Sequence, residues 1–113
     1  MALIQNFSVR AGNSQAINFD VGPDDSTPSY IGMNIQWTVY QMSVIGQPDL
    51  QNIVLQKVLD DGLQIDDPET HKFHVDLSRG DTLDLVGNYY HLAQVIDADG
   101  NYTDVTLGVM TVI

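Results

Sequence analysis

Apolar and polar residues alternate along several short segments of this chain, with the period of two that half-buried β-strands require. The clearest alternation covers residues 33–39, in which Met33, Ile35, Trp37 and Val39 share one face. A strand therefore begins close to residue 33. The same alternation predicts further strands over residues 6–10, 17–21 and 72–77.

A longer strand and a tight hairpin are predicted in the C-terminal half. Over residues 88–96, every second side chain from Tyr89 to Val95, His91 included, is expected to face the core. The Asp-Gly pair at residues 99–100 is a strong hairpin signal, and a last strand follows, with Gly108 as a bulge or bend. The opposite face is also largely apolar, which indicates a central strand or a covered outer side. Its residues are Tyr90, Leu92, Gln94 and Ile96.

Residues 49–61 fit two different elements. A helix would take Asp49 as its N-cap and end at Gly62, with Leu50 and Ile53 on one apolar face. A strand is supported by the short β-branched run that begins at Ile53. We favour the strand, and the helix stays open as the alternative.

Two segments between the strands are expected to form loops or turns. Residues 22–29 are polar and contain two prolines, which predicts a loop long enough to cross between two sheets. Residues 81–85 need only a small turn or a brief 3-10 segment before the strand at residues 88–96. Turns therefore interrupt the chain at short intervals, as in an all-β domain.

Seven strands of this kind indicate an all-β domain, and two aromatic residues indicate its type. Trp37 lies on the third strand, where immunoglobulin-like sandwiches carry a core Trp. Leu85, Gly87, Tyr89 and His91 have the spacing of the tyrosine corner of that fold, with His91 at the Cys position. The sequence therefore predicts one immunoglobulin-like two-sheet antiparallel sandwich over residues 1–113, without a disulfide.

Charge and composition narrow the choice of partners. The chain has 15 acidic and 4 basic residues, a net charge of -11, and no Cys. All acids but Glu69 are Asp, which favours turns over helices. Such a surface repels nucleic acid and anionic membranes, so neither is an expected partner. No signal peptide and no membrane-spanning run is expected.

The predicted hairpin tip also resembles the opening of a calcium loop. Asp97, Asp99 and Asn101 supply alternating oxygen ligands, with Gly100 at the bend. The twelfth position from Asp97 is Gly108, however, where an EF-hand needs a bidentate Glu, and the flanking residues read as strands. We expect a plain hairpin and keep these three residues as candidates for weak calcium binding.

No reaction is indicated by the remaining polar residues. His71 and His74 are three residues apart, which on a strand places them on opposite faces, so a shared metal is not expected. His91 faces the core and is expected to be structural. The paired acids at residues 24–25, 60–61 and 66–67 fit solvated turns. We therefore expect no enzyme, no cofactor and no catalytic residue.

The corner and hairpin residues resemble a known group of proteins. Residues 81–83, 85–91, 97–100 and 107–112 look like the C-terminal half of small Ig-like proteins of tailed phages and prophages. The N-terminal domains of phage baseplate upper proteins are similar in layout. The resemblance implies a virion structural role, with protein made in the bacterial cytoplasm, and it carries over no catalytic residues.

Two classes of function follow. The first is a structural or assembly protein of a phage particle (tail, baseplate, neck or capsid surface), which contacts other virion proteins or itself as a homo-oligomer. The expected contact surface is Tyr90, Leu92, Ile96 and Tyr40. The second is a carbohydrate- or ligand-binding module, which would need an exposed aromatic platform. That platform would consist of Tyr30, Tyr40, Tyr90 and Tyr102.

Overall fold

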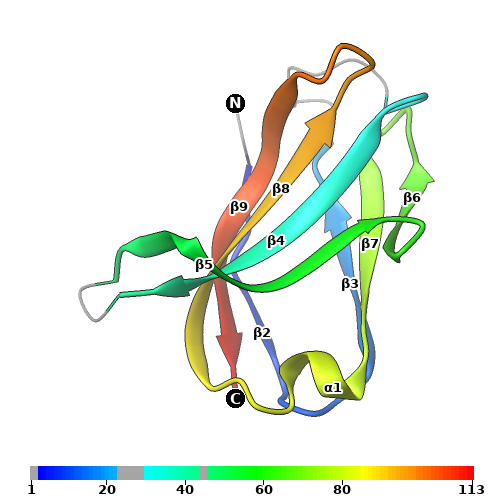
Figure 1. The fold of residues 1–113 in the computed structure, drawn as a ribbon. Coiled ribbons are helices and arrows are strands. Elements are labelled where there is room, and N and C mark those ends of the chain that lie inside the picture. Colours follow the sequence, from blue (N-terminus) through cyan, green and yellow to red (C-terminus); the bar gives the residue numbers. More distant parts are fainter. Residues whose placement is uncertain (1–2, 23–29, 44–45) are drawn as a thin grey trace.

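A computed structural model describes residues 3–22, 30–43 and 46–113 and shows an all-β fold (Figure 1). This part of the chain forms nine strands and one short helix. The prediction of an all-β domain is confirmed. In chain order the elements are β1 (Leu3–Ile4), β2 (Phe7–Val9), β3 (Gln15–Asp20), β4 (Asn34–Met42), β5 (Pro48–Leu59), β6 (Gly62–Asp67), β7 (Lys72–Leu77), α1 (Arg79–Thr82), β8 (Gly87–Ile96) and β9 (Tyr102–Val112).

The strands form one curled, mixed sheet. Its order is β1-β9-β8-β4-β5-β6-β7-β3, and β2 also pairs with β9. Two residue pairs join the halves of this sheet: β5 and β6 run parallel only at Val58↔Gly62 and Leu59↔Leu63. The sheet is therefore a continuous half-barrel, whereas the sequence predicted two separate sheets.

Most of the predicted strands are present, and two predictions need correction. The alternating segments at residues 33–39, 72–77 and 88–96 lie in β4, β7 and β8. Residues 49–61 lie mainly in β5, so the helix alternative is wrong. Strands β1 and β6 were not predicted, and together they raise the number of strands from the seven expected to nine in the described residues. The expected loop at residues 22–29 lies outside the described residues except for Gly22.

The strand predicted at residues 6–10 is present as β2, and an additional strand, β1, precedes it; both run parallel to β9. Between them the Gln5 N–H donates to the Leu107 carbonyl at 2.8 Å. Gly108 lies in close contact with residues 5 and 6 of this segment. A side chain at position 108 would collide with the Gln5 carbonyl and the Asn6 side chain. The irregular register of β8 and β9 lies elsewhere, between Ala93 and Gln94. Gly108 is thus required for close approach of the N-terminal segment.

The core lies inside the curl of the sheet, and Trp37 is at its centre. The Trp37 side chain is fully buried and lies opposite Ala93 of β8, as expected. Its ring centroid is 6.3 Å from that of Phe19, which in turn stacks on Phe73 at 5.0 Å. Strands from both halves of the sheet therefore meet in one aromatic cluster.

The predicted tyrosine corner is present at the start of β8. The Val86 N–H donates to the Tyr89 hydroxyl oxygen at 3.1 Å, so the phenol is bonded to the backbone just before it. The preceding connection contains the four-residue helix α1, where a small turn or a brief 3-10 segment was expected. The Thr82 hydroxyl of this helix is buried and accepts a hydrogen bond from the Gly12 N–H at 3.0 Å. This bond ties the corner to the turn between β2 and β3.

Candidate functional site

The four residues predicted as a contact surface lie on one face of the sheet. Tyr40 of β4 is directly opposite Tyr90 of β8, and their ring centroids are 6.0 Å apart. Leu92 and Ile96 follow Tyr90 by two and six residues, so their side chains share its side of β8. We call this the outer face, because the opposite side chains of the same strands form the core.

Two residues of β9 also belong to the outer face, and they were not predicted from the sequence. Val109 lies opposite Tyr90, and Leu107 lies opposite Leu92. Both side chains are partly buried. The hairpin register counted outward from the Asp-Gly turn would have placed Thr106 opposite Leu92, but the irregularity near Gln94 shifts the pairing by one residue. Because this irregularity has no sequence signal, two of the five residues of the apolar cluster were not predicted.

A row of polar side chains divides the outer face. The Gln36 amide donates to the Gln94 side-chain oxygen at 3.1 Å, and the Gln94 amide donates to Asp104 at 2.8 Å. This row crosses β4, β8 and β9. Ile96 and its partner Tyr102 lie beyond it, separate from the Tyr40–Tyr90 pair. The predicted surface is therefore one apolar cluster and a smaller patch with a hydrogen-bonded row between them.

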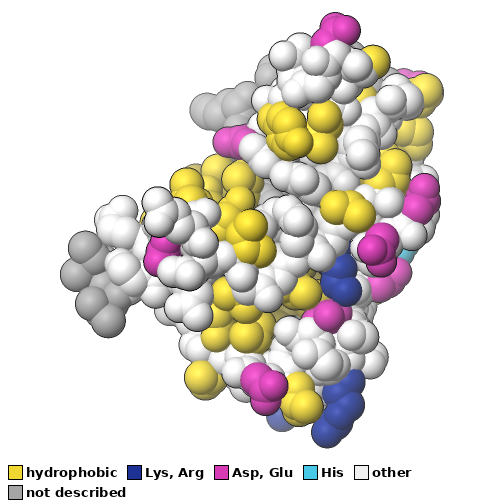
Figure 2. Space-filling view, in the orientation of Figure 1, with side chains coloured by type: hydrophobic (Ala, Val, Ile, Leu, Met, Phe, Trp, Pro, Cys, Tyr) yellow, Lys and Arg dark blue, Asp and Glu magenta, His cyan; other side chains and the backbone are white. Residues whose placement is uncertain are grey.

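The residues of the outer face range from partly buried to exposed, and the negative charge of Asp104 acts on Tyr90. In Figure 2, hydrophobic side chains lie among polar ones over the strands β4, β5 and β8. Tyr102 is 58% exposed and Ile53, which lies opposite Tyr40, is 56% exposed. Partial burial, together with the negative charge of Asp104, raises the pKa of the Tyr90 phenol above its usual value. The face is thus partly dehydrated, and its residues combine apolar area with hydroxyl groups.

On the core side of β8, His91 is fully buried in a hydrogen-bonded chain. Its Nε2–H donates to the Gln5 carbonyl at 2.6 Å, and its Nδ1 accepts from the Trp37 indole N–H at 3.2 Å. These partners fix a neutral imidazole with the proton on Nε2. The ring also packs edge-on against Phe7 and beside Phe19. The prediction that His91 faces the core is confirmed.

The stability of the protein is expected to fall in acid because of His91. Burial lowers the pKa of His91 below its ordinary value of about 6.5, although the bond to Gln5 opposes this. The unfolded chain therefore takes up a proton at a pH where the folded chain does not. As the pH falls below about 6.5, this group reduces the unfolding free energy by up to about 1.4 kcal/mol per pH unit. Urea unfolding at several pH values measures this slope.

The variant His91→Gln isolates this effect, because a glutamine can donate to Gln5 and accept from Trp37 without titrating. All other ionisable residues are the same in both proteins, so the difference between the two pH profiles reports His91. We expect the profile of the variant to be flatter below about pH 6.5. Parallel profiles would show that His91 has the same proton affinity in the folded and unfolded chains.

The three candidate calcium ligands lie in the hairpin between β8 and β9. One Asp97 carboxylate oxygen accepts from the backbone N–H groups of Asp99 and Asn101, both at 2.9 Å. The other accepts from the Asn101 side chain at 3.2 Å. These bonds lower the pKa of Asp97. The hairpin expected here is present, and its first carboxylate serves to hold the turn.

The other polar candidates are directed to separate partners. His71 stacks on Tyr30, with ring centroids 4.4 Å apart, and its Nδ1 bonds to the Gly22 carbonyl at 3.0 Å. His74 bonds to Asp66 at 2.8 Å. The neighbouring Asp67 accepts hydrogen bonds from the side chain of Thr70 and from the backbone N–H groups of Thr70 and Glu69, which lower its pKa. In the described residues, no three His, Cys, Asp or Glu side chains come together as a metal site.

The aromatic platform proposed for a carbohydrate-binding module is corrected by the structure. Tyr30 is only 1% exposed and stacks on His71. Tyr40 and Tyr90 remain as a pair on the outer face, and Tyr102 lies beyond the polar row. The four tyrosines therefore do not form one surface.

Two further findings concern membranes and relatives. Within the described segments, no helix has the length and hydrophobicity that crossing a membrane requires. No protein-family model matches the chain, and no curated protein matches it either.

Proposed function

We propose that this chain is a non-enzymatic structural or assembly protein of a phage or prophage particle, acting through protein–protein contacts. Its place would be a tail, baseplate, neck or capsid surface. Support for the phage assignment comes from the corner and hairpin residues, which resemble small Ig-like proteins of tailed phages. Support for the mode of action comes from the outer face.

We further propose that the curled sheet is an immunoglobulin-like sandwich. In this interpretation β9, β8, β4 and β5 form one layer, and β6, β7 and β3 form the other. The buried Trp37 of β4 and the bonded hydroxyl of Tyr89 support it, because both are features of that fold. The pairing at Leu59↔Leu63 then links two layers that diverge beyond it.

The apolar cluster of the outer face is the observation that carries the proposed function. Tyr40, Tyr90, Leu92, Leu107 and Val109 come from three adjacent strands, and register brings them together. Apolar side chains gathered on one face of a sheet are typical of surfaces that bind another protein. We propose a second copy of the chain as the occupant, because a face of this kind can pair with itself across a two-fold axis.

Self-association through this face is expected to depend on salt. Each copy carries a net charge of -11, so two copies repel one another at low ionic strength. Raising the salt concentration to about 0.15 M shortens the screening length to about 8 Å and strengthens the dimer. Leu92→Lys, which puts a charge into the apolar cluster, is expected to weaken association by at least about tenfold. Sedimentation equilibrium at several concentrations measures both effects.

The matched control is Val86→Lys, which places the same charge at an 80% exposed position away from the outer face. Thermal melting shows whether both variants stay folded. A wild-type protein that is monomeric at every concentration and salt level would contradict self-association.

Proteomics of purified particles induced from the source organism tests the phage assignment separately, and absence of the chain from those particles would contradict it.

A carbohydrate-binding module is the second candidate, and the Tyr40–Tyr90 pair is the observation that favours it. The planes of the two rings are inclined to each other by 35°, and both rings lie on the solvent side of the sheet. Aromatic rings of this kind stack on sugars. Glycan binding that is lost in Tyr40→Ala but kept in Tyr102→Ala would favour this candidate over assembly.

A further inference from the structure

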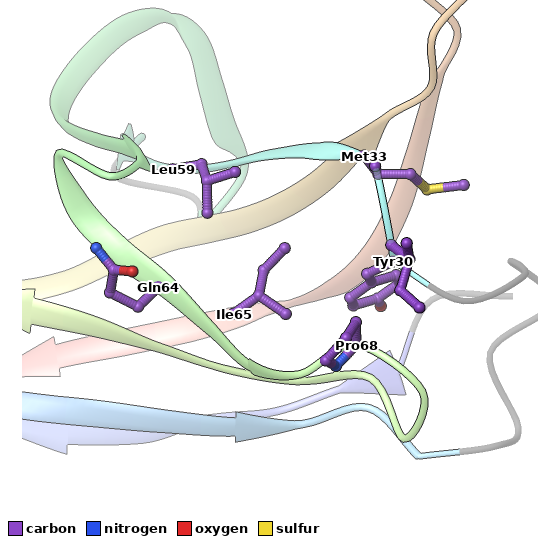
Figure 3. A pocket seen from close by; sticks show the side chains of 8 residues that line it. Tyr30, Met33, Leu59, Gln64, Ile65 and Pro68 are labelled. Atoms are coloured by element: carbon purple, nitrogen blue, oxygen red, sulfur yellow. The ribbon is translucent and has the colours of Figure 1, made fainter.

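A second surface lies where the sheet opens, on residues separate from the outer face. Strand β5 ends at Leu59, which pairs with Leu63, so the part of β6 after Leu63 has no partner from β5. A groove of about 460 Å³ lies between the segment that leads into β4 and the edge of β6. Figure 3 shows Leu59, Ile65 and Tyr30 around this groove, with the Ile65 side chain directed toward the space between the strands. The groove therefore exists because β5 ends beside Leu63 and does not cover the rest of β6.

The lining of the groove is mostly apolar. Tyr30 is buried at its base, and Ile31, which is 63% exposed, stands at its rim. The Tyr30 N–H donates to the Pro68 carbonyl at 3.0 Å, which joins the two walls at one end. An apolar site with a fixed wall loses little conformational entropy on binding. The lining residues are Tyr30, Ile31, Gly32, Met33, Leu59, Gln64, Ile65 and Pro68.

The wall formed by β6 presents its backbone to the groove. The Leu63 carbonyl accepts from the Asp60 N–H at 2.9 Å, on the side of β5. Because backbone groups alternate in direction along a strand, the N–H and C=O of Ile65 point to this same side, away from β7. Among the described residues, no strand pairs with Ile65 there. An open strand edge next to an apolar groove is the arrangement that accepts an added strand.

Charge around the groove indicates the chemistry of the occupant. Asp60 and Asp61 precede β6, while Asp66, Asp67 and Glu69 lie at its end or just after it. The eight lining residues include no Lys or Arg. Lys57, on the neighbouring strand, is bound to Asp81 at 2.8 Å, and Lys72 of β7 lies opposite Asp67, so one of the five acids has a basic neighbour. This acidic rim attracts basic segments and repels a second copy of this acidic chain.

We propose that this groove binds an extended segment of a different protein, which adds as a strand to the edge of β6. Its backbone pairs with the N–H and C=O of Ile65. Alternate apolar side chains enter the groove against Leu59 and Ile65, and Lys or Arg side chains between them lie near Asp60 and Asp67. The binding surface does not include the outer face, so it stands whether or not the chain associates with itself.

The test uses a synthetic peptide of about eight residues with alternating Val and Lys, blocked at both ends. In two-dimensional NMR of the labelled protein, we expect shift changes centred on residues 64–67 and on Ile31 at about 1 mM peptide. Exchange of the Ile65 amide proton with solvent should slow by at least about tenfold, because its N–H becomes hydrogen-bonded. A peptide of alternating Val and Glu should leave both measurements unchanged.

Two variants and one control make the result specific. Ile31→Arg and Gln64→Arg each place a positive charge at the groove and are expected to weaken peptide binding by about tenfold or more. Val86→Arg, at an exposed position distant from the groove lining, should bind as the wild type does. Self-association measured on Ile31→Arg should be unchanged, which separates this proposal from the outer-face dimer.

Three results would overturn the proposal. The first is the absence of shift changes at residues 64–67 with the basic peptide. The second is a set of changes confined to β3, the last strand in the order of the sheet, which among the described strands pairs with β7 alone. The third is equal binding of the acidic peptide, which would show that the acidic rim does not select the partner.

Discussion

Trp37→Ala is expected to reduce the unfolding free energy by about 3–5 kcal/mol. The indole is fully buried, so its removal leaves a cavity among Phe19, Ala93 and His91. It also deprives the His91 Nδ1 of its donor. Because domains of this size are stable by only about 5–15 kcal/mol, a large part of the total would be lost. Urea or guanidinium unfolding followed by far-UV circular dichroism measures the change.

Tyr102→Ala provides the comparison, since it also removes a large aromatic ring but from a 58% exposed position. A change within about 1 kcal/mol is expected there. If both variants unfold at the wild-type denaturant concentration, the indole does not pack in the core. Trp37→Phe separates packing from hydrogen bonding, because it keeps most of the ring volume and loses the N–H.

Gly108→Ala is expected to cost about 2–4 kcal/mol, more than an alanine normally costs on a strand. Its φ of +154° is one that L-residues rarely adopt. A methyl group would also collide with the Gln5 carbonyl, which is backbone and cannot rotate away. The N-terminal segment must then shift, and the bond from His91 to Gln5 is weakened with it. The change in unfolding free energy, and loss of amide protection at Gln5, measure this.

Gly100→Ala is the matched control for the energetic cost of placing an alanine at a positive φ. Gly100 has a φ of +82°, and no atom lies within 4 Å of the added methyl group. This variant therefore carries conformational strain without a collision, at about 1 kcal/mol. Equal effects at Gly100 and Gly108 would show that the contact with Gln5 adds nothing.

Much of the fold could be predicted because several strands have one buried and one exposed face. In β4 and β8 this alternation places Trp37 and His91 in the core, and the structure agrees. Strand β5 was ambiguous because residues 50–53 are exposed on both sides, so burial imposes no period of two. Strand β6 was missed because only Leu63 and Ile65 alternate before its acidic end.

The candidate surfaces were predictable only where one strand contains them. Parity along β8 placed Tyr90, Leu92 and Ile96 together, but their partners in β9 depend on a shift in register near Gln94. The groove by β6 had no sequence signal at all. It combines residues 30–33, 59, 64, 65 and 68, and it exists because β5 ends at Leu59 and leaves the rest of β6 without a partner on that side, which is a tertiary property.

The parallel pairing of β1 and β2 with β9 also governs the order in which the fold can assemble. Thr106 donates its hydroxyl proton to the Leu3 carbonyl across a sequence separation of 103 residues. Contacts this distant carry a large loop-closure cost and slow folding. During synthesis β1 and β2 cannot pair with β9 until β9 has been made. We therefore expect the N-terminal segment to dock last, on a sheet of β3 to β9 that has already formed.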